Sequence, residues 1–225
     1  MIGAFGNAEV FSFHATKFLN TFEGGAVVTN DRALAAKIRL MRDSGFAGYD
    51  EISCIGTNGK MSEVSAAMGL AYLDCLDEFI AVNRSHYHHY LQGLTGIPGV
   101  SVLSYDDQER YNYQYVVLEI DEAIAHVSRD QLQDVLWAEN VLARRYYFAG
   151  CHRMEPYRSS MSGDGLRLPN TERLAEQVLV LPTGTAIVPD EISDICQIIR
   201  LAALAGEELS HRSQGCPATG RDVLG

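Results

Sequence analysis

A lysine that follows a short apolar run is the residue of this sequence best suited to covalent chemistry. Lys17 comes just after the run at residues 10–13, and the pair Gly24-Gly25 then opens a second apolar run. An amine in a semi-buried site has a lowered pKa, which suits it to bond with the carbonyl carbon of a substrate or cofactor. Ser12 offers a hydroxyl that could hold a phosphate. Taken alone, a lysine at a strand end is more often a surface residue whose charged end reaches water.

Two predicted strands and a helix must position this lysine. Residues 8–13 and 25–29 are rich in β-branched and aromatic side chains, which favour strands. Asp31 is expected to cap a helix with apolar residues at helical spacing, and Gly45 lies just past its end. Such a group of elements cannot bury its own faces. This region therefore needs a sheet partner that the chain does not visibly contain.

The rest of the chain predicts a long helix and a smaller α+β unit. The helix is expected from Ser62 to about Leu91, where a broad apolar stripe indicates burial of one face. Further strands are expected over residues 100–103, 113–120 and 141–147. Further helices are expected over residues 128–140, with Ser128 as N-cap, 171–179 and 189–204. From residue 207 onward the polar tail is predicted to be disordered.

Composition limits the class of protein. The chain has 225 residues and a formal net charge of −11, which argues against a general binder of nucleic acid or anionic membranes. Its five cysteines are scattered and have neither metal-ligand nor redox spacing, so reduced thiols in a cytoplasmic protein are expected. The sequence shows neither a signal peptide pattern nor an apolar run long enough for a membrane helix.

Several ordered blocks between residues 12 and 179 resemble the DegT family of sugar aminotransferases. They begin with Ser-Phe-His-Ala-Thr-Lys at residues 12–17 and Glu-Gly-Gly-Ala-Val-Val-Thr-Asn at residues 23–30. The other blocks lie at residues 56–63, 66–70, 112–115, 151–157 and 171–179. Members of this family are pyridoxal-phosphate enzymes of the aspartate aminotransferase fold.

The resemblance implies an α/β fold class. It predicts part of the large domain of a fold type I pyridoxal-phosphate transferase and a small α+β C-terminal domain. The expected divisions are a large-domain remnant over 1–60, a bridging helix over 61–95, the small domain over 96–206 and the tail over 207–225.

In this family, most of the large domain precedes the lysine segment. That part grips the cofactor phosphate, stacks an aromatic residue on the ring and pairs an aspartate with the pyridine nitrogen. Only sixteen residues precede Lys17 here. We therefore expect the C-terminal part of such an enzyme, produced by truncation, an internal start or a split gene.

The resemblance assigns roles to individual residues. It implies that Lys17 binds pyridoxal phosphate covalently and moves the substrate proton, and that Ser12 donates to the cofactor phosphate. Asn58 is implied to reach the cofactor of the neighbouring subunit, and Lys60 stands where many relatives carry arginine. His14 could line the cofactor pocket or be a satisfied core histidine. Ordinary alternatives are a strand serine bonded to nearby backbone for Ser12 and a turn asparagine for Asn58.

A dense basic group could bind the diphosphate of a nucleotide sugar. Its members are Arg144, Arg145, His152, Arg153 and Arg158. His152 and Arg153, with Lys60, are the predicted substrate-binding residues, since cations and bidentate guanidinium contacts suit phosphate. A solvated surface is the competing interpretation. The histidines of the predicted long helix lack a supporting cluster of acids or cysteines, so no metal site is expected there.

The predicted function is transfer of an amino group to a nucleotide-linked keto sugar. The resemblance implies glutamate as amino donor, C4 of a 4-keto-6-deoxy sugar as the nearest match, and a homodimer with shared active sites. Neither nucleic acid nor a membrane is an expected partner. The alternative is an N-terminally truncated, non-catalytic fragment or interaction module of the same family.

Overall fold

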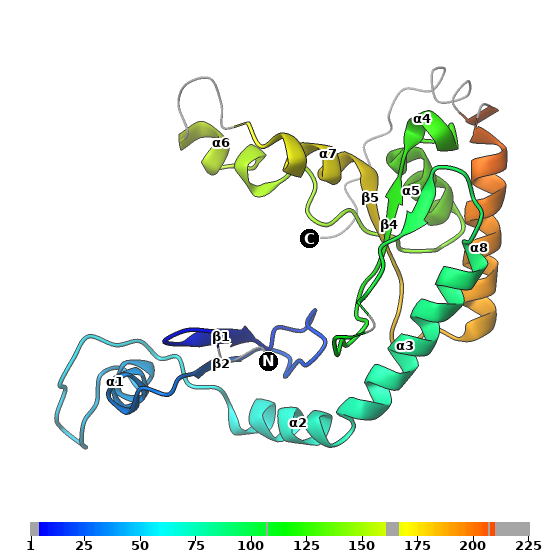
Figure 1. Cartoon of the computed structure of the whole chain (residues 1–225). Helices are drawn as coiled ribbons and strands as arrows, with labels where there is room; N and C mark the ends of the chain where they lie inside the picture. Colours follow the sequence, from blue (N-terminus) through cyan, green and yellow to red (C-terminus); the bar gives the residue numbers. More distant parts are fainter. Residues whose placement is uncertain (1–4, 107, 161–166, 207, 210–225) are drawn as a thin grey trace. The chain divides into compact units, whose positions relative to one another are not determined.

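The computed structural model describes residues 5–106, 108–160, 167–206 and 208–209. It divides into two compact units, Met1–Glu78 and Phe79–Gly225 (Figure 1). Most of the tail predicted from residue 207 onward lies outside the described residues. In the part that is described, no helix is both long and apolar enough to cross a lipid bilayer.

The first unit begins with two strands close to the predicted ranges 8–13 and 25–29, and they form an antiparallel pair. Strand β1 (Glu9–Ser12) pairs with β2 (Gly25–Val28), with Ser12 opposite Gly25. Helix α1 (Arg32–Arg42) follows, and the carboxylate of Asp31 accepts the backbone N–H groups of its first turn. This N-cap satisfies donors that have no partner within the helix. The predicted cap and helix are therefore confirmed.

The first unit has almost no core of its own. Among its described residues, only Thr21 and Gly45 are buried. Large apolar side chains instead face solvent, among them Val10 at 79% and Ile55 at 92% exposure. Monomeric proteins rarely expose large contiguous apolar patches. The exposed apolar side chains of the first unit therefore agree with the expected need for a sheet partner.

The single helix predicted from Ser62 to about Leu91 is found as two helices. Helix α2 (Glu63–Asp74) ends at Cys75, and α3 (Leu76–Gly93) begins directly after it. The Cys75 N–H bonds to the carbonyls of Tyr72 and Leu73, which tightens and ends the first helix. Because only Cys75 separates the two helices, the helical spacing of the apolar residues continues across the break, and the sequence does not reveal it. The predicted divisions at 60/61 and 95/96 remain a prediction.

The second unit contains a three-stranded antiparallel sheet in the order β3-β4-β5. The strands are β3 (Val100–Val102), β4 (Val116–Ile120) and β5 (Val178–Leu181). Two sequence predictions are corrected here. The strand expected over 141–147 is only an isolated bridge between Arg144 and Val180, and the C-terminal end of the helix expected over 171–179 is the start of β5. A short continuous apolar run has no periodicity that separates strand from helix.

Helices cover this sheet. Helix α5 (Arg129–Ala138) starts with a capping box formed by Ser128 and Gln131, and α8 (Pro189–Leu204) has proline in its first turn, as predicted. The remaining elements are α4 (Glu122–Ala125), η1 (Cys151–Arg153), α6 (Tyr157–Ser160) and α7 (Pro169–Gln177).

Helices α3 and α8 lie side by side and close the core of the second unit (Figure 1). A Cβ atom added to Gly93 of α3 would lie 2.6 Å from the Cys196 sulfur of α8. The fully buried side chains include Tyr90, Leu118, Leu132, Ile192 and Ile199. Unlike the first unit, this unit therefore buries a continuous apolar core.

Candidate active site

Lys17 lies in the loop that joins β1 to β2. The loop is closed at its ends, where the Phe13 N–H donates to the Gly24 carbonyl at 2.8 Å. The Lys17 N–H donates to the His14 carbonyl at 2.9 Å. On its other side, the Lys17 carbonyl accepts from the Asn20 side chain at 3.3 Å. The main chain at Lys17 is therefore fixed from both directions by the loop itself.

The Lys17 amine is half-buried and takes part in no hydrogen bond or ion pair with another described residue. The other lysines of the chain are Lys37, which is exposed on α1, and Lys60, which pairs with Asp43. An amine held by a carboxylate must break that contact before it can attack a carbonyl carbon. Lys17 is thus a half-buried lysine whose amine has no partner among the described residues, and the exposed Lys37 also has none.

Ser12 and His14 lie on the chain just before Lys17. Ser12 is the last residue of β1, is exposed, and its hydroxyl oxygen accepts from the His14 N–H at 3.4 Å. His14 Nδ1 accepts the Thr16 N–H at 3.2 Å, and the other ring nitrogen is Nε2. That nitrogen lies 3.5 Å from a Glu23 carboxylate oxygen. Because His14 is exposed, its interpretation as a core histidine is wrong.

Asn58 and Lys60 lie in the loop that precedes α2. Asn58 forms an isolated backbone bridge with Asp43, and the Lys60 amine bonds to the Asp43 carboxylate. The structure therefore brings these two predicted residues together at Asp43. It also gives Lys60 a partner within the chain, so binding a phosphate there requires competition with that carboxylate.

Sequence reasoning missed Thr21, which is 1% exposed. Its hydroxyl donates to the Glu23 carbonyl at 2.9 Å, and its N–H donates to the Phe13 carbonyl at 3.0 Å. The residue thus bonds to both halves of the loop that carries Lys17. A threonine in a short spacer does not by itself predict burial. Its position four residues after Lys17 was the only signal in the sequence that could have pointed to it.

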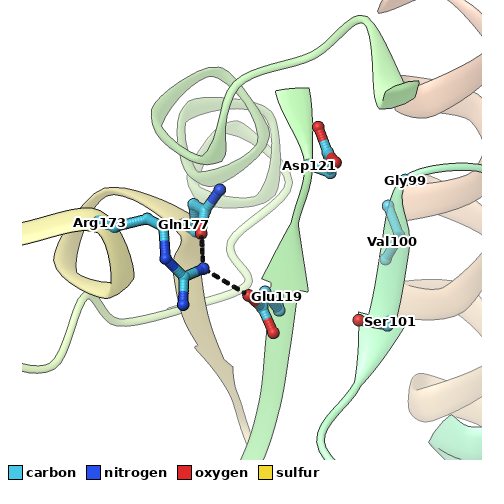
Figure 2. A pocket seen from close by; sticks show the side chains of 7 residues that line it. All are labelled: Gly99, Val100, Ser101, Glu119, Asp121, Arg173 and Gln177. Atoms are coloured by element: carbon cyan, nitrogen blue, oxygen red, sulfur yellow. Dashed lines mark hydrogen bonds and ion pairs between the residues drawn. The ribbon is translucent and has the colours of Figure 1, made fainter. Parts of the chain in front are cut away.

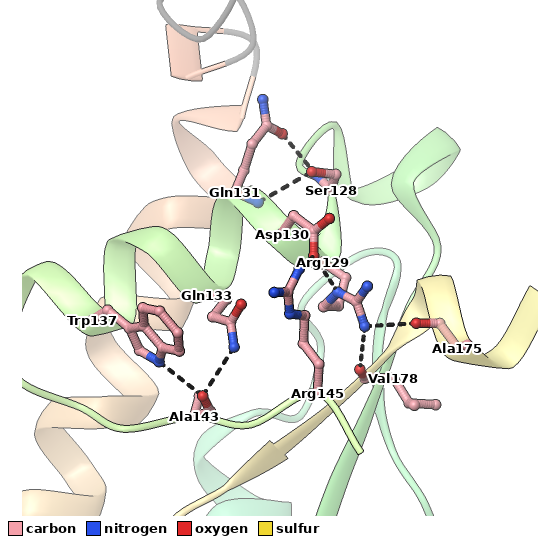
Figure 3. A network of polar contacts seen from close by, with 10 residues as sticks. All are labelled: Ser128, Arg129, Asp130, Gln131, Gln133, Trp137, Ala143, Arg145, Ala175 and Val178. Carbon is pink, nitrogen blue, oxygen red and sulfur yellow. Dashed lines mark hydrogen bonds and ion pairs between the residues drawn. The ribbon is translucent and has the colours of Figure 1, made fainter. Parts of the chain in front are cut away.

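Two arginines of the predicted basic group are held by local partners, and one of them, Arg145, is drawn in Figure 3. The Arg145 guanidinium bonds to Asp130 at 3.0 Å and lies 4.6 Å from the centre of the Phe148 ring. Arg144 donates to the Tyr146 hydroxyl at 3.0 Å. Both contacts are exposed, so the two cations lie near solvent although each is bonded to a group of the protein.

His152 and Arg153 share one carboxylate, that of Glu172 in α7. His152 Nε2 lies 3.2 Å from one Glu172 oxygen, and an Arg153 nitrogen lies 2.8 Å from the other. Hydrogen bonds from the Leu168 N–H and from His152, with the charge of Arg153, hold the pKa of Glu172 below its ordinary range. The His152 side chain is 6% exposed, whereas Arg153 is 46% exposed. Arg153 therefore has the better access to a ligand.

The predicted basic group is thus divided into separate contacts. Arg158, its last member, bonds to Glu155 at 2.6 Å. The structure brings His152 and Arg153 together and links each of the other three cations to a different partner. A single concentrated anion site made by all five is not formed within the described residues.

A polar cavity of about 330 Å³ lies beside β3, β4 and α7 (Figure 2). Arg173 donates to Glu119 at 3.1 Å and to Gln177 at 2.6 Å across it. None of the predicted site residues lines this cavity. Within the described ranges, no group of three or more histidine, cysteine, aspartate or glutamate side chains could hold a metal ion.

Known proteins match the chain over nearly its whole length. A dTDP-4-amino-4,6-dideoxy-D-glucose transaminase of Shigella dysenteriae is 34% identical over 195 residues, which are 87% of this chain and 52% of that protein. A dTDP-3-amino-3,4,6-trideoxy-alpha-D-glucose transaminase of Streptomyces venezuelae is 32% identical over 185 residues, with 81% of this chain and 47% of that protein covered.

Solved structures show the same fold. The crystal structure of DesI, obtained with its TDP-sugar product, superposes with a TM-score of 0.86 at 49% identity and covers 94% of this chain and 53% of that chain. The DesV structure from S. venezuelae gives a TM-score of 0.79 at 28% identity, with 90% of this chain and 53% of that chain covered. The predicted fold class, a partial α/β aminotransferase fold, is confirmed.

The chain spans about half the length of the curated relatives it matches. The family model described as the DegT/DnrJ/EryC1/StrS aminotransferase family matches residues 1–200. The resemblance carried by the sequence blocks is therefore confirmed, and the chain belongs to the DegT/DnrJ/EryC1/StrS aminotransferase family.

Proposed function

We propose that this chain carries the lysine segment and small domain of a pyridoxal-phosphate-dependent aminotransferase that acts on a nucleotide-linked keto sugar. The observation that carries the proposal is Lys17, whose main chain is fixed by the loop and whose amine has no partner among the described residues. Two relatives are named as transaminases of dTDP-linked amino sugars, which supports a nucleotide-linked sugar as the substrate class.

The residues around Lys17 fit the cofactor chemically. Pyridoxal phosphate presents an aldehyde carbon and a phosphate, and Lys17 and Ser12 offer an amine and an exposed hydroxyl on one short segment. When bound, the cofactor supplies a ring that accepts the electrons released at the substrate carbon. Lys17 Nζ would hold the cofactor at its aldehyde carbon and would carry the proton that leaves or joins the substrate carbon. Ser12 Oγ would donate a hydrogen bond to a phosphate oxygen.

The substrate and partner assignments extend this proposal. Arg153 is the better placed of the predicted substrate residues to bind a diphosphate, and His152 orients the carboxylate that it shares with Arg153. Glutamate is the proposed amino donor, and C4 of a 4-keto-6-deoxy sugar is the proposed acceptor position. Asn58, beside Asp43 in the loop before α2, is proposed to reach the cofactor of a second subunit. The exposed apolar faces of the first unit support association of this kind.

A non-catalytic role is the second candidate, and one observation favours it. The described part of the first unit buries only Thr21 and Gly45, so it has little apolar packing to hold a cofactor site rigid. In that case the chain would keep the family fold as a binding or assembly module.

One experiment separates the two candidates. The chain is incubated with pyridoxal phosphate, L-glutamate and a dTDP-4-keto-6-deoxy sugar, and the amino sugar is measured by mass spectrometry. We expect product with the wild-type chain and none with Lys17→Ala, with sedimentation showing a dimer or larger species. A folded monomer that forms no amino sugar would overturn the catalytic proposal and leave the module.

A further inference from the structure

We propose that Thr21 and Gly69 are positioning residues for Lys17, acting through one packing contact between the lysine loop and helix α2. The inference rests on the proposed function, because it concerns how the reactive amine is held. It adds two residues to which the sequence motifs assigned no role.

Thr21 lies where the lysine loop meets the rest of the first unit. Its N–H bonds to the Phe13 carbonyl and its hydroxyl to the Glu23 carbonyl, so it links the start of the loop to its end. The same hydroxyl lies 3.7 Å from the Met61 sulfur. A shift of Thr21 must therefore displace the loop that contains Lys17.

Gly69 provides the space that Thr21 occupies. A Cβ atom added to Gly69 would lie 2.8 Å from the Thr21 methyl carbon, closer than real Cβ atoms come to a neighbour. Gly69 lies in the interior of α2, where glycine is less favourable than alanine by about 1 kcal/mol. A glycine at such a helix position is explained by close packing. Here the close neighbour is Thr21.

Helix α2 contacts the lysine loop at a second point. The ring of Phe18, the residue directly after Lys17, packs edge-on against Tyr72 of α2 with centroids 6.2 Å apart. Tyr72 lies three residues after Gly69, so it is on the same face of the helix. Both ends of the stretch Phe18–Thr21 thus contact one face of α2. Because Phe18 directly follows Lys17, these contacts fix the position of the Lys17 main chain.

The test uses the small number of lysines. The full chain is treated with pyridoxal phosphate, reduced with borohydride and digested, and labelling at Lys17 is divided by labelling at the exposed Lys37. For Gly69→Ala we expect this ratio to fall roughly fivefold or more, because an extra methyl group forces packed neighbours apart. Gly48→Ala is the matched control, since its added Cβ would meet nothing nearer than 3.8 Å.

A double variant makes the test specific to the contact. Thr21→Ser keeps the hydroxyl and deletes the methyl group that meets position 69, so Thr21→Ser combined with Gly69→Ala should restore the ratio to within about twofold. An unchanged ratio in Gly69→Ala would overturn the inference, as would a double variant labelled no better than Gly69→Ala. Circular dichroism checks that each variant keeps its helices.

A second readout separates this inference from the proposed function. The rates of acetylation of Lys17 and Lys37 are measured at one fixed pH, without cofactor. The inference predicts that Gly69→Ala changes the acetylation rate at Lys17, because the amine is displaced, and leaves the rate at Lys37 unchanged. If the wild type shows no preferential cofactor labelling at Lys17, the proposed function fails. The inference itself fails if the acetylation rate of Lys17 is the same in wild type and Gly69→Ala.

Discussion

Replacing Arg129 by methionine removes the guanidinium that joins α5 to the junction of α7 and β5. Arg129 is 2% exposed and donates to the carbonyls of Ala175 at 2.8 Å and Val178 at 3.0 Å (Figure 3). Its Nε also bonds to Asp130 at 2.6 Å. Methionine fills a similar volume without any donor, so the two carbonyls lose their partner while the packing is largely kept.

The cost follows from these bonds. A hydrogen bond from a charged donor contributes about 1.5–3 kcal/mol, so the bonds to Ala175 and Val178 together represent about 3–6 kcal/mol. Part of this is offset, because burying methionine avoids the desolvation of a guanidinium. The Asp130 carboxylate keeps Arg145 as its partner. We expect a net loss of about 3 kcal/mol in the free energy of unfolding.

Urea denaturation measures this loss through Trp137, the only tryptophan of the sequence. Its indole N–H donates to the Ala143 carbonyl at 2.8 Å, so its fluorescence reports on the packing of α5. With a slope of about 2 kcal/mol per molar urea, the midpoint should fall by about 1.5 M. Arg158→Met is the matched control, because Arg158 is 69% exposed and its ion pair contributes little. Equal midpoints for the two variants would refute the reasoning.

Three further predictions use other parts of the chain. Burial raises the pKa of the Cys196 thiol to about 11, so iodoacetamide at pH 8 should modify the exposed Cys151 quickly and Cys196 only after urea is added; fast native labelling of Cys196 would contradict its burial. Because folding lowers the pKa of Glu172 from its ordinary 4.5, this carboxylate stabilises the fold above about pH 4.5 and loses that contribution as the pH falls through its lower folded value. Glu172→Gln should therefore reduce the drop in urea midpoint between pH 6 and pH 3, and an unchanged drop would count against the contact. Amide hydrogen exchange should be faster in residues 5–78 than in the described residues from 79 to 206, because the described core lies in the second unit; equal protection in both would show that the first unit has packing of its own.

Local signals in the sequence predicted much of the fold. Asp31 and Ser128 were identified as helix caps because their side chains bond to backbone N–H groups within three residues, a contact that needs no distant partner. Pro189 marked the start of α8 for a similar reason. Strand β5 was missed because its pairing with β4 joins segments far apart in the chain. The apolar run that follows α7 has no local feature that distinguishes a strand from one more helical turn.

The candidate site also combines residues that are close in the sequence with contacts between distant segments. Ser12 and Lys17 could be proposed as site residues from one short stretch, since both lie in a single strand and the loop that follows it. The ion pairs of Lys60 with Asp43 and of Arg153 with Glu172 join separate segments, so the sequence could not show that these cations already have partners. The contact of Thr21 with Gly69 also joins distant segments, and neither residue type predicts it.

The most direct test of the central claim is an absorbance titration of the chain with pyridoxal phosphate. Lysine-bound cofactor absorbs at wavelengths where protein does not, and Lys17, Lys37 and Lys60 are the lysines of the sequence. The account predicts a saturable band in the wild type and in Lys60→Ala that is absent in Lys17→Ala. A band of equal size in Lys17→Ala, or one lost in Lys60→Ala alone, would contradict it.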